Sequence, residues 1–462
     1  MTEITQWTAT ETAAALAARK VSVVEVTHAH LARYDGAIEG LNAITEAFPE
    51  HALEHARALD ASGPDPAQAL WGLPISIKLN VDMAGYASTN GVPGLRDNIV
   101  NADSTVVANL KAAGPVVLGR TNAPEFSLRW FTSNPLFGET LNPLDPSLTP
   151  GGSSGGAAAA VAAGIGVMSH GNDLGGSLRN PAYSCGLVTL RPSMGKVPAW
   201  NPSAAERPMV TAMMSVQGMI ARSVADVRLA MGPLSTRSEK DPFWNNAPDS
   251  GRARNTPLRI GIAYDPLGDG VAPDVERAVK AARDAVKAAG CEVVEQALPM
   301  IHEAAQTWGE VLVNETEHLM MDGIKTYGSS DVIRTLEAYR DHFGLLDIAG
   351  FMAAQARRQT ILREWNHMFE AVDAVIMPVS SDLPYRADQD FREPDTIPDI
   401  LRGHRILYAI NLLGLPAAVV PTVRTQPVPL GVQVVSAWRD DDLCLDVAEM
   451  IERELALNIR PF

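Results

Sequence analysis

The chain has 462 residues, of which 46% are hydrophobic and 20% are charged, a balance typical of a globular protein with an extended core. Its 38 basic residues are outnumbered by 54 acidic ones, which gives a net charge of −16 with histidine neutral. This excess of negative charge argues against a surface that follows nucleic-acid phosphates or adheres to anionic membranes, so we expect neither as a partner.

The first predicted elements, in residues 1–64, are helices. Thr8 with Glu11, and Ser22 with Glu25, each fit a capping box, in which a hydroxyl and a carboxylate satisfy the backbone amides at the start of a helix. A segment rich in proline and glycine then ends this helical part.

Strands and helices alternate after this break. Residues 75–81 and 115–119 predict strands, and residues 104–113 predict the helix between them. Glycine, serine and alanine dominate residues 150–195, but residues 157–163 have the helix propensity of a packed helix rather than of a linker. The alternation predicts an α/β fold with a central, mostly mixed β-sheet covered by helices on both faces.

The second half of the chain resumes this pattern. A polar segment, residues 236–257, is predicted to be a surface loop. The elements expected after it are strands at 258–263, 374–378, 417–420 and 431–435, helices at 274–289 and up to residue 372, and a closing helix. Because no linker or repeat divides the chain, we predict a single large domain over residues 1–462. Its parts are a helical N-terminal part (1–64), a catalytic core (65–235), the surface loop, and a helical cap region with the rest of the sheet (258–462).

The cysteines and the N-terminus predict the compartment. Cys185, Cys291 and Cys444 are too few and too scattered for a disulfide framework, which favours a reducing environment. The N-terminus has no basic start followed by an apolar stretch, so we expect no signal peptide. The longest apolar run, residues 157–168, falls short of the about 20 residues that a membrane span needs. We therefore expect a cytoplasmic protein.

Three short motifs carry the functional prediction. Residues 151–156 have the sequence GGSSGG, residues 173–179 have the sequence DLGGSLR, and Lys78 lies inside an otherwise apolar predicted strand. Each is a weak signal alone, because glycine-serine runs usually form tight turns and a strand lysine usually faces water. Their combination in one chain is far more specific.

The glycines before Ser177 suggest an oxyanion hole. Without side chains, Gly175 and Gly176 leave the neighbouring amides open to one bound oxygen. The predicted hole comprises the amides of Leu174, Gly175, Gly176 and Ser177. Ser177 would be the nucleophile. A serine hydroxyl with its ordinary pKa stays protonated and is a weak nucleophile, so it needs an adjacent base.

Lys78 is the predicted base. Its apolar neighbours Ile77 and Leu79 suggest burial, which lowers a lysine pKa by disfavouring the charged form and so makes the neutral amine available. Ser153 would pass the proton between Ser177 and Lys78.

In this order and spacing, the motifs resemble the amidase signature family. The resemblance runs nearly end to end through residues 151–195 and reaches residues 119–126 and 411–417, so it covers most of the chain. It implies the amidase signature fold and a serine hydrolase of carboxylic amides that needs neither metal nor cofactor. Ser177 would form the acyl-enzyme, with Ser153 and Lys78 as the proton relay.

The resemblance also assigns supporting roles. It implies a cis peptide bond before Ser153, which Gly152 would ease. We expect Asp173 and Arg179 to brace the nucleophile loop through hydrogen bonds and ion pairing rather than to move protons.

Three positions depart from the family pattern. Leu79 stands where an aspartate is frequent, Asn172 where a small residue usually precedes the DxGGS motif, and Leu174 where threonine or isoleucine is commoner. None removes a catalytic group, but together they leave the substrate open.

By analogy with the family, aromatic segments border the substrate pocket. The candidate residues are Trp130, Phe131, Phe137 and Ser154, with Met209, Met213 and Trp308 as further candidates and core packing as the alternative explanation. Such side chains favour uncharged aryl or medium acyl amides over glutamine. The expected partner is this small amide, and a homodimer is one option for the assembly.

Several alternatives remain. Within the family, the chain would be a glutaminase subunit of a tRNA-dependent amidotransferase, or a member without activity. Residues 151–155 also match G-x-S-x-G, the nucleophile elbow of α/β-hydrolase esterases, with Ser153 as nucleophile and a late histidine such as His404. That elbow must directly follow a strand, and the proline-rich residues 142–150 argue against one. No GK[ST] follows the glycines, so the signal for a phosphate-binding loop is absent.

Overall fold

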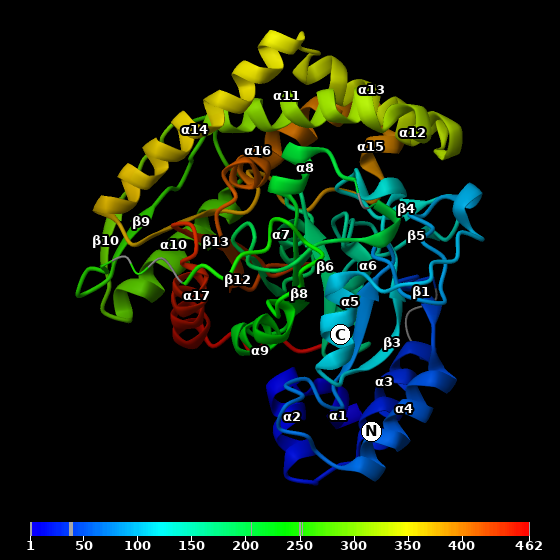
Figure 1. Cartoon of the computed structure of the whole chain (residues 1–462). Helices are drawn as coiled ribbons and strands as arrows, with labels where there is room; N and C mark the ends of the chain where they lie inside the picture. Colours follow the sequence, from blue (N-terminus) through cyan, green and yellow to red (C-terminus); the bar gives the residue numbers. More distant parts are fainter. Residues whose placement is uncertain (1, 37–39, 205, 249–250, 252, 462) are drawn as a thin grey trace.

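The structure is a computed structural model that describes residues 2–36, 40–204, 206–248, 251 and 253–461. Its centre is an 11-stranded sheet with the strand order β1-β3-β2-β6-β8-β7-β12-β13-β11-β9-β10, and a small hairpin pairs β4 with β5 (Figure 1). The strands are β1 (Ile44–Ala47), β2 (Pro74–Lys78), β3 (Val116–Thr121), β4 (Ser133–Asn134), β5 (Gly138–Glu139), β6 (Met168–Asp173), β7 (Val188–Arg191), β8 (Val216–Ala221), β9 (Arg259–Ile262), β10 (Glu292–Glu295), β11 (Ala374–Pro378), β12 (Ala417–Val423) and β13 (Leu430–Ser436).

Helices surround this sheet. They are α1 (Thr2–Gln6), α2 (Ala9–Ala17), α3 (Val23–Asp35), α4 (Pro49–Ser62), α5 (Thr105–Ala112), α6 (Gly155–Ala162), α7 (Arg179–Ser184), α8 (Met209–Met214), α9 (Val224–Leu234), α10 (Pro273–Ala288), α11 (Ile301–Leu319), α12 (Met321–Tyr327), α13 (Ser330–Phe343), α14 (Ile348–Ala371), α15 (Gln389–Arg392), α16 (Ile397–Leu413) and α17 (Asp441–Leu455). In Figure 1, α11 to α14 form a layer on one side of the sheet, and α1 to α4 lie at the opposite end of the molecule.

The two faces of the sheet bury different hydrophobic clusters. In β11, Ala374 and Ile376 belong to the cluster that includes α10 and α17, whereas Val375 and Met377 belong to the cluster of α11, α13, α14 and α16. Successive side chains of a strand point to opposite faces, so both faces of this sheet are covered by helices. The chain is thus a single large α/β domain, and the predicted fold class is confirmed.

The register of the sheet prepares the functional site. Strand β2 pairs parallel with both β3 and β6, and Ser76 is aligned with Ser169 in the β2–β6 pair. Lys78, the last residue of β2, therefore lies beside the carboxyl end of β6. The nucleophile loop, residues 173–179, begins where β6 ends.

Several sequence predictions hold and three central strands were missed. Both capping boxes are present, and β11 has the predicted bounds 374–378. The missed strands are β6, β7 and β8, with the sequences MSHGND, VTLR and VQGMIA, whose residues are almost all buried but do not alternate between apolar and polar as a strand with one exposed face would. In the described part of residues 236–257 there is no helix or strand.

Two further findings, for the described residues, concern disulfide bonds and membrane-spanning helices. All three cysteines are free. None of the helices is both long enough and apolar enough to cross a membrane.

Candidate active site

Lys78 and Ser153 are in direct contact. The Lys78 Nζ atom lies 2.7 Å from Ser153 Oγ and 2.7 Å from Asn172 Oδ1. Burial lowers the pKa of Lys78 well below its usual value, and the nearby Asp173 carboxylate opposes this effect only in part. The amine is therefore favoured in its neutral form, whose lone pair can accept the proton of the Ser153 hydroxyl.

The glycine-rich segment brings Ser153 to Lys78 without room for larger residues. A Cβ atom on Gly152 would lie 2.5 Å from the backbone nitrogen of Phe131, so only glycine fits there. The peptide bond between Gly152 and Ser153 is cis. The Ser154 amide donates to the Ser177 carbonyl at 3.3 Å, which ties this segment to the nucleophile loop.

The nucleophile loop is folded around a buried carboxylate. Asp173 accepts hydrogen bonds from the amides of Gly176 (2.8 Å) and Leu178 (3.2 Å), and pairs with Arg179 at 3.0 Å. Although burial alone would raise the pKa of Asp173, the Arg179 guanidinium holds it well below its usual value. Asp173 and Arg179 are thus placed to brace the loop.

This arrangement corrects one member of the predicted oxyanion hole. The Gly176 amide is occupied by Asp173 and is not free for a substrate oxygen. The amides of Leu174, Gly175 and Ser177 donate to no protein acceptor within the part of the chain that the structure describes. These three amides are the remaining candidates for the hole.

Two tryptophans orient the peptide groups of the loop. The Trp308 indole N–H donates to the Leu174 carbonyl at 3.0 Å, and the Trp130 indole N–H donates to the Gly175 carbonyl at 2.8 Å. In a trans peptide the N–H points away from the C=O, so the bond from Trp308 aims the Gly175 amide to the opposite side. Trp130, predicted as a substrate contact, thus holds the loop, and with Trp308 it also lines a small hollow beside Ser177.

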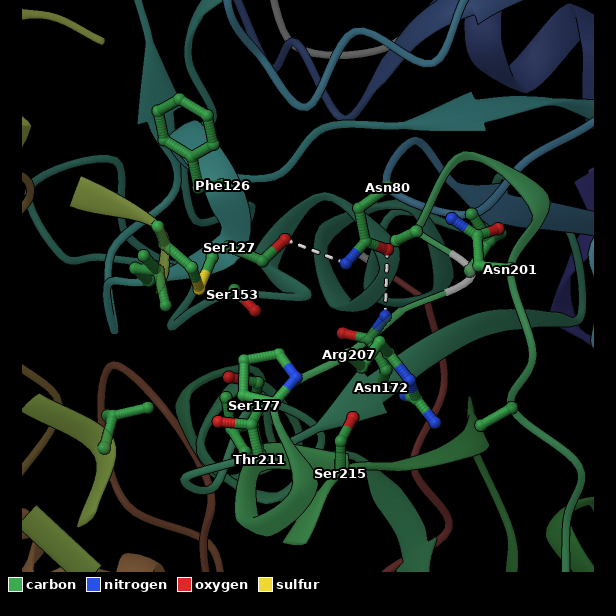
Figure 2. Close-up of a pocket in the computed structure, with 18 of the residues that line it drawn as sticks. Asn80, Phe126, Ser127, Ser153, Asn172, Ser177, Asn201, Arg207, Thr211 and Ser215 are labelled. Carbon is green, nitrogen blue, oxygen red and sulfur yellow. Dashed lines mark hydrogen bonds between the residues drawn. The ribbon is translucent and has the colours of Figure 1, made fainter. Parts of the chain in front are cut away.

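A cavity of about 690 Å³ contains Ser153 and Ser177 (Figure 2). Its apolar lining residues are Val81, Phe126, Leu128, Pro208, Met209, Leu312, Leu319 and Met320. Its polar and charged lining residues include Asn80, Ser127, Asn172, Asn201, Glu206, Arg207, Thr211, Ser215 and Gln217. The cavity therefore offers both apolar side chains and polar groups to a substrate near the two serines.

Phe131, Ser154 and Phe137, also predicted as substrate contacts, do not line this cavity. Phe131 is buried, with its ring 6.3 Å from that of Tyr385. The Ser154 hydroxyl is engaged with the backbone of Asn172 at 3.3 Å. Phe137 lines a different cavity, where its carbonyl accepts a hydrogen bond from Asn42. Among the further candidates, Met209 lines the cavity, whereas Met213 and Trp308 do not.

The nucleophile-elbow alternative lacks its structural context. Residues 140–154 contain no strand, so none leads into Ser153. His404 is buried, with Nδ1 at 2.9 Å from the Ile400 carbonyl and its ring stacked on Trp130 at 4.9 Å. The G-x-S-x-G match is therefore coincidental.

Two hydrogen-bond networks that include lining residues of the cavity were not predicted from the sequence. Asn172 Nδ2 donates to Asn80 Oδ1 (2.9 Å), and Asn80 Nδ2 donates to Ser127 Oγ (2.9 Å), as the dashed lines in Figure 2 show. His170 Nε2 lies 3.0 Å from Gln217 Oε1, and burial lowers the pKa of His170 to about 3, so this imidazole is neutral. The unusual Asn172 was the one available sequence signal.

Comparison with known proteins gives relatives over nearly the whole chain. An indoleacetamide hydrolase of Bradyrhizobium diazoefficiens is 42% identical over 451 residues, which cover 97% of this chain and 86% of that protein. A glutamyl-tRNA(Gln) amidotransferase subunit of Oleidesulfovibrio alaskensis is 30% identical, with 98% of each chain covered.

Solved structures agree with these relatives. A 6-aminohexanoate cyclic dimer hydrolase has a TM-score of 0.85 and 25% identity, with 99% of each chain covered. A bacterial aryl acylamidase has a TM-score of 0.83 and 26% identity, covering 97% of this chain and 96% of that one. The family model described as Amidase matches residues 25–445. The chain therefore belongs to the amidase signature family and is a hydrolase of amide carbon–nitrogen bonds.

Proposed function

We propose that this enzyme hydrolyses uncharged aryl or medium acyl amides through an acyl-enzyme on Ser177. The contact between Lys78 and Ser153, within the same site as Ser177, is the observation that carries the proposed chemistry. The apolar lining residues of the cavity and the 42% identity to an indoleacetamide hydrolase support an arylacetamide-like substrate.

The reaction begins with proton transfer away from Ser177. Its hydroxyl proton passes to Ser153 Oγ while the Ser153 proton passes to the neutral Lys78 amine. Ser177 Oγ then bonds to the amide carbon, and the carbonyl oxygen becomes an oxyanion.

The free loop amides stabilise this charge. The amides of Leu174, Gly175 and Ser177 are the available donors. The carbonyls of the same three peptide groups accept hydrogen bonds from Asn411, Trp308 and Asn180, which orients these amides before the substrate arrives. The proton on Lys78 returns through Ser153 to the leaving nitrogen, which departs as ammonia or an amine. Water, activated by the same relay, then hydrolyses the ester on Ser177.

One observation favours a second candidate, a glutaminase. Arg207 lines the cavity, and among the described residues no carboxylate lies within 4 Å of its guanidinium, although the charge of Asp241 acts on it from farther away. A free guanidinium is suited to a carboxylate such as that of glutamine. The 30% identity to an amidotransferase subunit points the same way.

Turnover of the isolated enzyme distinguishes the two. We expect faster release of ammonia from indole-3-acetamide or benzamide than from glutamine, with loss of activity in Ser177→Ala and Lys78→Met. Arg207→Ala is expected to leave hydrolysis of the neutral amides within about threefold of the wild type. Glutamine turnover that exceeds aryl amide turnover and is lost in Arg207→Ala would establish the glutaminase instead. Turnover that survives in Ser177→Ala would refute the assigned nucleophile.

A further inference from the structure

We propose that Asn172 is a positioning residue that keeps Lys78 a neutral base and directs its lone pair at Ser153. The inference rests on the proposed function for the roles of Lys78 and Ser153. Two observations support it: the hydrogen bonds around Lys78 Nζ, and the fact that the partner other than Ser153 is the neutral amide of Asn172.

The orientation of the Asn172 amide is fixed from both sides. Lys78 Nζ has two hydrogen-bond partners, Ser153 Oγ and Asn172 Oδ1, each at 2.7 Å. The opposite end of the Asn172 amide donates to Asn80 Oδ1, and Asn80 in turn donates to Ser127. The oxygen of Asn172 thus faces the lysine, and this orientation alone serves both protonation states, because the ammonium has no lone pair that could accept from an amide N–H.

This geometry assigns the hydrogens of the neutral amine. A neutral lysine nitrogen has two hydrogens and one lone pair. Since Asn172 Oδ1 accepts one hydrogen, rotation about the last bond of the lysine side chain can place the lone pair toward Ser153. After the proton is received, the ammonium donates to both oxygens without any change of partner.

The partner of Lys78 is an amide, whereas a carboxylate at this distance would stabilise the ammonium form. The charged groups on the neighbouring strands are already committed. Asp173 on β6 is paired with Arg179, His170 on β6 is neutral, and Arg120 on β3 is paired with Glu46. Helix α6, which also packs on β2, has the sequence GGAAAAVA and carries no titratable group. Of the two hydrogen-bond partners of Lys78, Asn172 is the one that can be given a negative charge by a substitution of the same size, Asn172→Asp.

Two substitutions at this position shift the base in opposite directions. Asn172→Asp places a carboxylate against Nζ, so the pKa of Lys78 rises because the negative charge favours the ammonium form. Asn80 can turn its amide to donate to this carboxylate, which keeps the network intact. Asn172→Leu removes the acceptor without adding charge, so the pKa of Lys78 falls and the amine loses its orientation. Asn172→Ala carries the same expectation if leucine prevents folding.

The pKa of Lys78 can be measured without any turnover. The ¹³Cε signal of lysine is titrated in ¹³C-lysine-labelled protein of the Ser177→Ala background, with Lys78→Met to assign the signal. In parallel, the rate at which a fluorophosphonate labels Ser177 is measured against pH in the Ser177 enzyme. We expect the acidic limb of this profile to move up in Asn172→Asp, which costs about tenfold in rate per unit on the limb. In Asn172→Leu we expect the limb to move down and the plateau to fall at least tenfold.

The control is Asn201→Asp, which places a negative charge in the same cavity. Asn201 accepts a hydrogen bond from the Asp82 amide and has none with Lys78. We expect the limb to keep its position in this variant. Movement of both Asn172 variants in one direction, or an unmoved Lys78 signal in Asn172→Asp, would overturn the inference. If the Lys78 signal moves as expected but neither labelling nor amide turnover occurs, the inference stands and the proposed function fails.

Discussion

The nucleophile loop and the rim of the cavity are built in contrasting ways. The loop, residues 173–179, is held by a buried ion pair and by two indole N–H groups. The rim, residues 199–204 and 206–211, is partly exposed, and Met209 is 59% exposed. The chemical groups are thus held by buried interactions on every side, whereas the rim is a partly exposed segment attached at separate points, such as the bonds from Ser203 to Asp82 and from α8 to Glu315. Five substitutions, grouped in four tests, examine this comparison in order of decreasing effect.

The largest effect is expected from Arg179→Ala. It leaves the Asp173 carboxylate buried without its cation, and breaking a buried pair in this way costs about 3–5 kcal/mol. We expect a large drop in melting temperature and in soluble yield. The control is Arg392→Ala, which breaks an exposed pair with Glu139 and costs at most about 1 kcal/mol. A stable Arg179→Ala enzyme with an altered pH profile would mean that the pair takes part in proton transfer.

Trp308→Phe tests how the loop amides are oriented. The substitution keeps an aromatic ring but removes the N–H that holds the Leu174 carbonyl. We expect kcat to fall about tenfold to a hundredfold with KM nearly unchanged, because the loss falls on oxyanion stabilisation. Trp365→Phe removes an equivalent bond to the Pro299 carbonyl, outside the cavity, and should leave kcat within about twofold. Equal losses in the two variants would contradict the role of Trp308.

Glu315→Gln addresses the attachment of the rim. The Glu315 carboxylate accepts hydrogen bonds from the amides of Val210 and Thr211 and from the Thr211 hydroxyl, which anchors the start of α8. Replacing one oxygen by NH₂ opposes a donor with a donor, so we expect KM to rise about threefold to tenfold while kcat changes less. Glu310→Gln neutralises another carboxylate of α11, bonded to Arg357, and should change neither constant. A fall in kcat alone would show that α8 affects catalysis rather than binding.

The smallest effects are expected at the mouth of the cavity. Met209→Ser and Leu319→Ser each replace an exposed apolar lining residue, so we expect KM for an aryl amide to rise about twofold to fivefold. Ile348→Ser is the control, since Ile348 is 80% exposed and does not line the cavity. Should glutamine turnover rise in either mouth variant while aryl amide turnover falls, the apolar rim would be the element that selects against glutamine.

Elements that depend on neighbours in the chain were predicted from the sequence, whereas elements that depend on contacts between distant segments were not. The capping boxes and the apolar strand β11 depend on neighbours in the chain, and both were predicted correctly. Strand β6 was missed because its polar residues are stabilised by contacts with β2 and β8.

The site shows the same division. The candidate catalytic residues stand in short motifs and could be named, and the structure brings Lys78 and Ser153 into contact. The use of the Gly176 amide by Asp173, and the attachment of Trp130 to a carbonyl, depend on how the loop folds. An aromatic residue near a motif does not reveal whether its ring contacts substrate or its N–H holds the backbone. Of the residues predicted as substrate contacts, only Met209 lines the cavity that contains both serines, while Trp130 and Trp308 line the small hollow beside Ser177.

Helix α11 carries, on a single face, residues that hold other segments in place and residues that line the cavity. Trp308, Leu312, Glu315 and Leu319 follow one another at intervals of four, three and four residues, which places them on one stripe of the helix. Trp308 and Glu315 hold other segments, whereas Leu312 and Leu319 border the cavity. For evolution or enzyme engineering, this stripe separates positions by their tolerance: libraries at 312 and 319 should retune substrate range, while 308 and 315 should stay invariant among the active clones.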